Sequence, residues 1–168
     1  MVNTAFVARH GICSIQCLYY ITWHCRCKGK GLEMDTRYID AEHRLATALG
    51  WVGADYTGLA AVRDGRAQGM APDGTRSGYV PAWARSGDDC VSLMLAHRCF
   101  VAAEVTSDGI EVMVARWKDA HGFPERLAVP SAEHASEDAA FRYAAVLGVT
   151  LQVEAKAQAR ELTSLVSA

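Results

Sequence analysis

Four cysteines lie close together near the start of this 168-residue chain, and cysteine thiolates are strong ligands for zinc. They are Cys13, Cys17, Cys25 and Cys27, with His24 between the two pairs. Structural zinc sites usually pair their ligands two to four residues apart, and Cys-x-Cys is tight for two ligands on one ion. A zinc module, or a metal-dependent enzyme built on these cysteines, is therefore one hypothesis.

The segment that carries these cysteines, residues 1–33, allows a second interpretation. It lacks the basic start and the small-residue cleavage site of a signal peptide. Its apolar run, residues 12–23, is shorter than the roughly 20 residues that span a bilayer. Gly29-Lys30-Gly31 corresponds to purine-rich codons like those of a ribosome-binding site, and Met34 follows at a suitable distance. We favour a mis-assigned start and expect a poorly ordered extension.

His97 and Cys99 are another pair that could carry chemistry, because a histidine beside a cysteine can generate a nucleophilic thiolate. Two side chains at this spacing across a helix end diverge, and cysteine is among the most buried residue types. We favour a Cys99 that packs in the core. Cys90 and Cys99 are expected to be reduced thiols in a cytoplasmic protein.

Two groups of acidic residues could hold a metal ion. Asp88 and Asp89 follow Ser86 at the expected start of a helix, where the exposed N–H groups favour negative charge, so a capping role is favoured. Asp40, Glu42 and His43 form the other set. We expect Glu42 and His43 on a solvated face, opposite the apolar stripe of their helix.

Arg76, Trp83 and Arg85 form a basic and aromatic set of the kind that stacks on single-stranded nucleic acid. The net charge of −2 is uneven, because residues 1–33 contain four basic residues and one acidic residue (+3), which leaves −5 for the rest. An acidic body argues against nucleic-acid binding. No phosphate-binding loop, nucleophile elbow or His-Glu-x-x-His motif occurs. A non-enzymatic role, with no catalytic residue and no cofactor, is therefore favoured.

Residues 86–117 predict a helix that runs directly into a β-hairpin. From Phe100 the apolar period becomes two, and Asp108-Gly109 predicts the turn. The expected buried side consists of Val101, Ala103 and Val105 in the first strand and Ile110, Val112 and Val114 in the return strand, with Glu111 and Met113 opposite. Such a sheet is antiparallel and covered mainly on one side.

The rest of the chain predicts two further helices and a second hairpin. A helix from Thr36 or Asp40 ends at Gly50, and another starts after Ser136 and ends at Gly148. Small residues on the second helix allow close packing on a sheet. The remaining expectations are strands at 59–63 and 66–71 around Asp64-Gly65, loops at 53–58 and 72–78, and a strand at 126–129.

These elements predict an α+β fold: one antiparallel sheet of two hairpins packed with about three helices, as an α/β sandwich. The expected organisation is an extension at residues 1–33, a single domain at 34–149, and a helix or tail at 150–168.

Several of these features together resemble the phage ABA sandwich domain family, small proteins encoded by bacteriophages and prophages. The resemblance is carried by Gly50-Trp51, by the Pro-Asp-Gly turn at 72–74, and by residues 80–89, Val-Pro-Ala-Trp-Ala-Arg-Ser-Gly-Asp-Asp. Arg142 occupies the position of the family's arginine in an alanine-rich closing helix. The resemblance covers about residues 38–148 and implies a sandwich fold and a bacterial phage origin. It implies no activity.

We therefore expect a cytoplasmic, phage-derived accessory protein that acts by binding a protein partner or by self-association, without a nucleic-acid or membrane partner. Zinc binding through Cys13, Cys17, Cys25 and Cys27, catalysis by His97 and Cys99, and nucleic-acid binding through Arg76, Trp83 and Arg85 remain the alternatives.

Overall fold

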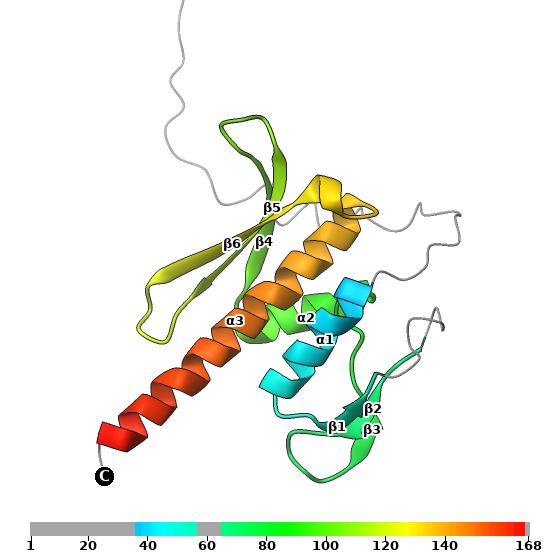
Figure 1. Ribbon diagram of the computed structural model, residues 1–168, viewed down its shortest axis with the longest axis vertical. Helices are drawn as coiled ribbons and strands as arrows, with labels where there is room; N and C mark the ends of the chain where they lie inside the picture. Colours follow the sequence, from blue (N-terminus) through cyan, green and yellow to red (C-terminus); the bar gives the residue numbers. More distant parts are fainter. Residues whose placement is uncertain (1–35, 57–64, 167–168) are drawn as a thin grey trace, which may run out of the picture. The chain divides into compact units, whose positions relative to one another are not determined.

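The computed structural model describes residues 36–56 and 65–166, which all fall within one unit, residues 32–168 (Figure 1). Its elements are α1 (Thr36–Ala48), β1 (Val52–Asp55), β2 (Gln68–Met70), β3 (Ser77–Tyr79), α2 (Gly87–His97), β4 (Phe100–Val105), β5 (Glu111–Lys118), β6 (Pro124–Pro130), the 3-10 turn η2 (Ser131–Glu133) and α3 (Glu137–Val166). The α+β class is confirmed. The expectation of one pooled sheet is wrong, because two separate antiparallel sheets form, β1-β2-β3 and β4-β5-β6.

The predicted helix and hairpin at residues 86–117 are confirmed. The Ser86 hydroxyl accepts a hydrogen bond from the Asp89 N–H at 3.3 Å and caps α2. Arg98 ends the helix in the left-handed conformation (φ +52°). In the turn between β4 and β5, Thr106 N–H donates to the Ile110 carbonyl at 2.9 Å, and Gly109 supplies the positive φ of +79°.

The faces of the β5 strand differ from the prediction. Val101 pairs with Ala115 and Ala103 with Met113, so Met113 lies on the side that joins the main core. Val112 and Val114 occupy the opposite side. The alternating pattern alone does not show which side of β5 faces the core, because Val112, Met113 and Val114 are all apolar and all buried.

Helix α3 packs very closely on the inner face of β4-β5-β6. A Cβ atom on Gly148 would lie 2.8 Å from the Ala115 Cβ and 3.1 Å from the Cys99 Sγ, so any larger residue would force its neighbours to shift. The predicted close packing of small residues on a sheet is confirmed. The predicted helix end at Gly148 is wrong, because α3 continues to Val166. Of the two alternatives for the chain after residue 150, helix is confirmed as far as Val166.

The small sheet also differs in part from the sequence-based expectation. The segment predicted as a loop at 53–58 contains most of β1, and the one at 72–78 contains the start of β3. β2 lies within the predicted strand 66–71 but pairs with β1 and β3. The predicted strand 59–63 lies outside the described residues. Gly50 ends α1 as predicted, with φ +87° and a hydrogen bond from Trp51 N–H to the Ala46 carbonyl.

The main core forms around α3, which contacts α1, α2 and all three strands of the larger sheet. In Figure 1, α3 crosses β4-β5-β6, and α1 and α2 lie beside it away from that sheet. Of the described helices, α3 alone packs extensively on the larger sheet, so this sheet is covered by helix on one face. In the described part of the chain, no helix combines the length and the apolarity needed to cross a bilayer.

Candidate functional site

The four cysteines proposed as zinc ligands, Cys13, Cys17, Cys25 and Cys27, lie outside the described residues. Within residues 36–56 and 65–166, no three His, Cys, Asp or Glu side chains gather closely enough to hold a metal ion.

His97 and Cys99 do not form a nucleophilic pair in the described structure. Cys99 is buried under Gly148 within the main core, which confirms the structural interpretation of this residue. Burial raises the pKa of the Cys99 thiol to about 11, so the thiolate is scarce at neutral pH. Burial, and then the nearby charge of Lys156, lowers the pKa of His97. Cys90 is also a buried free thiol.

Glu42 was expected on a solvated face, and this prediction is wrong, because its side chain is completely buried. One carboxylate oxygen accepts the Ala84 N–H at 2.8 Å, and the other accepts the Arg85 Nη2 at 2.9 Å. Arg85 also donates through Nη1 to the Gly65 carbonyl at 2.6 Å. Burial raises the pKa of Glu42, and the hydrogen bonds and charge of Arg85 oppose that rise. We call these two side chains the Glu42–Arg85 junction.

The same junction removes the proposed nucleic-acid patch from the surface. Trp83 is buried in the core and Arg85 is bound to Glu42, which leaves only Arg76 exposed from that set. Arg142 of α3 donates through Nε to the Ala84 carbonyl at 3.0 Å. The basic and aromatic residues of this segment therefore anchor the chain before α2.

The predicted cap at Asp88 and Asp89 is confirmed, because both lie in the first turn of α2. Asp89 has a further role that the sequence did not indicate. Its Oδ2 accepts the Ala82 N–H at 3.0 Å and lies 3.3 Å from the Arg66 Nη2.

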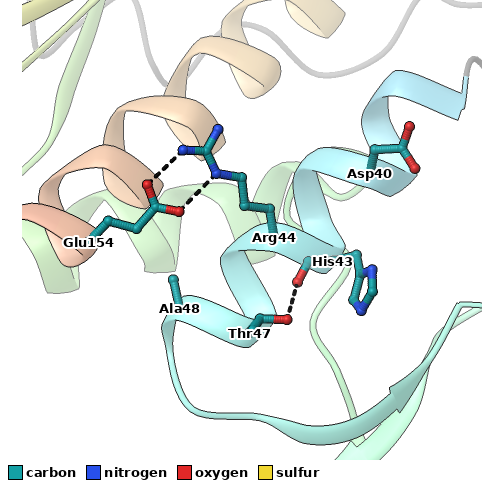
Figure 2. Close-up of a pocket in the computed structure, with 6 residues that line it drawn as sticks. All are labelled: Asp40, His43, Arg44, Thr47, Ala48 and Glu154. Atoms are coloured by element: carbon teal, nitrogen blue, oxygen red, sulfur yellow. Dashed lines mark hydrogen bonds and ion pairs between the residues drawn. The ribbon is translucent and has the colours of Figure 1, made fainter. Parts of the chain in front are cut away.

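A shallow hollow of about 470 Å³ lies between α1 and α3. Figure 2 shows Arg44 reaching across it to Glu154, with Nε and Nη2 donating to the two carboxylate oxygens at 2.8 and 2.6 Å. This pairing raises the pKa of Arg44 and lowers that of Glu154. Asp40 and His43 lie away from this ion pair in the same view, while Glu42 is buried in the core. The proposed Asp40, Glu42 and His43 metal set is therefore not brought together.

The larger sheet presents a different kind of surface. Four large apolar side chains of its strands and turns are more than half exposed: Phe100, Val105, Ile110 and Phe123. Phe100 pairs with Arg116, so it lies on the face opposite Ala115 and Trp117, which pack toward α3. An ion pair between Glu104 and Arg116 crosses this same outer face.

The sequence contains a signal for this surface. Neighbouring residues of a strand point to opposite faces, so Phe100 lies on one face and Val101 and Val105 lie on the other. One strand therefore carries large apolar residues on both faces. A strand of that kind in a sheet covered by helix on one side leaves some of them in solvent. We call the side of β4 and β5 away from α3 the outer face; Phe100 is exposed on it, Ala102 is half-buried, and Val112 and Val114 are buried.

Comparisons with known proteins do not supply a family: no protein-family model, no curated protein and no solved structure matches this chain.

Proposed function

We propose that this chain is a phage-derived accessory protein that acts by binding another protein or a further copy of itself through the β4-β5-β6 sheet. The observation that carries the proposal is that this sheet, which the described helices cover on one face, leaves large apolar side chains exposed. Phe100 is 66% exposed, and so are Val105 and Phe123. Phe100 and Val105 lie at the two ends of β4 and on its two faces, so apolar side chains are exposed along this strand.

Polar side chains elsewhere in the described structure are paired with one another, which indicates that they stabilise the fold. The Glu42–Arg85 junction satisfies both carboxylate oxygens, and the Arg44–Glu154 pair occupies the hollow between α1 and α3. Groups that are already paired offer little to a substrate. The phage origin is supported by the resemblance of residues 80–89 and Arg142, and the neighbouring genes in the source genome test it.

The binding role is tested by a photo-crosslinking amino acid at position 100 of the full chain, expressed in its own host. The matched control carries the same amino acid at Asp73, which lies in the exposed turn between β2 and β3. We expect position 100 to give one discrete crosslinked protein and position 73 to give none. Equal, diffuse or absent crosslinking at both positions would contradict the proposal.

A further inference from the structure

The two outer edges of the β4-β5-β6 sheet differ in their ability to accept another strand. In an antiparallel ladder, alternate residues direct both backbone groups toward the same neighbour. Asp119 N–H donates to the Phe123 carbonyl at 2.9 Å, which sets the phase of the β5–β6 ladder. The residues of β6 that face away from β5 are then Pro124, Arg126, Ala128 and Pro130. Two of these four lack an N–H, so proline blocks both ends of this edge.

The β4 edge has no such protection. The bond from Thr106 N–H to the Ile110 carbonyl sets the phase of the β4–β5 ladder, so Val101, Ala103 and Val105 direct their backbone groups away from β5. All three have an N–H and a C=O. No other described strand pairs with β4, and none of the three side chains is charged. An edge that proline does not block, and whose outward-directed residues carry no charge, is a template for an added strand.

We propose that β4 pairs antiparallel with β4 of a second copy of this chain, which joins two larger sheets into one of six strands. The three outward residues are symmetric about Ala103, so a twofold axis at Ala103 uses all of them. Ala103 then lies opposite its own equivalent, and Val101 lies opposite Val105 of the other copy. An interface that matches itself in this way is what a twofold dimer requires. The inference rests on the proposed binding role and names its partner.

The charges agree with this register. Glu104 of one copy lies opposite Ala102 of the other, and each Glu104 is already paired with Arg116. Beyond the strand ends, the register brings the start of β4, with the exposed Arg98, toward the turn of the other copy that carries the exposed Asp108. The twofold axis repeats this approach, so one pair of opposite charges lies at each end of the interface. The two pairs favour the antiparallel arrangement.

A hollow lies next to the end of the proposed interface, lined by residues of β4, β5, η2 and the start of α3. It has a volume of about 180 Å³, and its lining combines the apolar Ala103, Val105 and Met113 with Glu104, Glu111 and Glu137. The Ser131 Oγ is buried there without a hydrogen-bond partner. In the proposed register, Val101 of the second copy lies opposite Val105 and is the closest side chain to this hollow. Burial of that valine would remove apolar surface from water.

The test uses a charge exchange at the twofold axis. Ala103→Lys and Ala103→Glu each place two like charges opposite one another, while an equimolar mixture places opposite charges there. Ala128→Lys is the matched control, because Ala128 is also exposed and also directs its backbone outward, but on the proline-blocked edge. Light scattering gives the mass of the full-length chain in solution over a range of concentrations.

We expect the wild type and Ala128→Lys to form dimers, each Ala103 variant to dimerise at least tenfold more weakly, and the mixture to recover dimers. Circular dichroism checks that each variant folds. A wild type that stays monomeric at every concentration overturns the inference, whatever the variants do. So does an Ala103→Lys dimer as strong as that of Ala128→Lys, or a mixture that fails to recover. In the proposed register Phe100 lies opposite Thr106 of the second copy. A wild type that stays monomeric while position 100 crosslinks a different protein therefore overturns this inference and leaves the proposed binding role standing.

Discussion

The Glu42–Arg85 junction buries polar side chains, whereas the larger sheet leaves apolar side chains exposed. At the junction, a carboxylate and a guanidinium are buried together, and both carboxylate oxygens have partners. In the sheet, Phe100 and Val105 are exposed, and no strand of the described residues pairs with the outer edge of β4. Glu42 and Arg85, which were candidates for a site, therefore hold the fold together, and β4 carries exposed apolar side chains.

The strongest test of the junction is Arg85→Met, which leaves the Glu42 carboxylate buried without its counter-charge. We expect a loss of about 3–5 kcal/mol in the free energy of unfolding, because an unpaired buried charge is expensive. Urea denaturation at pH 7 measures the loss. A loss no larger than that of an exposed substitution such as Arg76→Met would contradict the structural role.

The pH dependence sharpens the same test. Burial raises the pKa of Glu42 above 4.5, so the folded state binds a proton more tightly than the unfolded state does. Stability from this group is then greatest at low pH and falls as the pH rises from the unfolded pKa through the folded one. Removing Arg85 raises the folded pKa further. We expect the deficit of Arg85→Met to be smaller near pH 4.5 than at pH 7.

The two faces of the larger sheet should respond unequally to truncation. Met113→Ala on the inner face should cost about 2–5 kcal/mol, because it leaves a cavity against the core. Phe100→Ser on the outer face should change stability by only about 0.5 kcal/mol, and crosslinking from a neighbouring outer-face position should weaken. Thermal or urea denaturation compares the pair. Equal costs would show that the assignment of the faces is wrong.

The contact between α3 and the sheet is tested by Gly148→Ala. The new Cβ would meet the Ala115 Cβ at 2.8 Å, and overpacking of this kind costs about 1–3 kcal/mol, partly offset by the better helix propensity of alanine. The control is Gly87→Ala at the start of α2, where a Cβ would meet no atom within 4 Å. We expect the control to be neutral or stabilising in urea denaturation. A stabilised Gly148→Ala protein would contradict the close packing.

The smallest expected effect is at the start of α2. Ser86→Ala removes the cap on the Asp89 N–H and should cost about 1 kcal/mol. Ser92 lies exposed within the same helix, so Ser92→Ala should leave stability unchanged or slightly raised. Urea denaturation of the two alanine variants separates the cap from a general effect of serine.

Local signals in the sequence predict much of this fold. Ser86, Gly50 and Gly109 act through their own backbone neighbourhoods, so their helix cap, helix end and turn are visible without tertiary information. Gly148 does not end its helix for the opposite reason: its small size serves contact with Ala115 and Cys99, which lie far away in the sequence. That packing outweighs the roughly 1 kcal/mol cost of glycine inside a helix.

Long-range pairing accounts for the other differences. Glu42 was expected in solvent because its partner, Arg85, is 43 residues away and nothing in the pattern joins them. The separation into two sheets, and the side taken by Met113, depend on which strands pair and in what register. The candidate surface also required that register, because the sequence shows Phe100 in a strand but not whether its side of the sheet is covered.

Amide hydrogen exchange of the wild-type chain at low and high protein concentration tests the central claim most directly. If β4 is the open edge that binds a second copy, the amides of Val101, Ala103 and Val105 should become protected as the concentration rises, while those of Arg126 and Ala128 on the proline-blocked edge stay unchanged. Fast exchange of the three β4 amides at every concentration, or equal protection of both edges, would contradict the account.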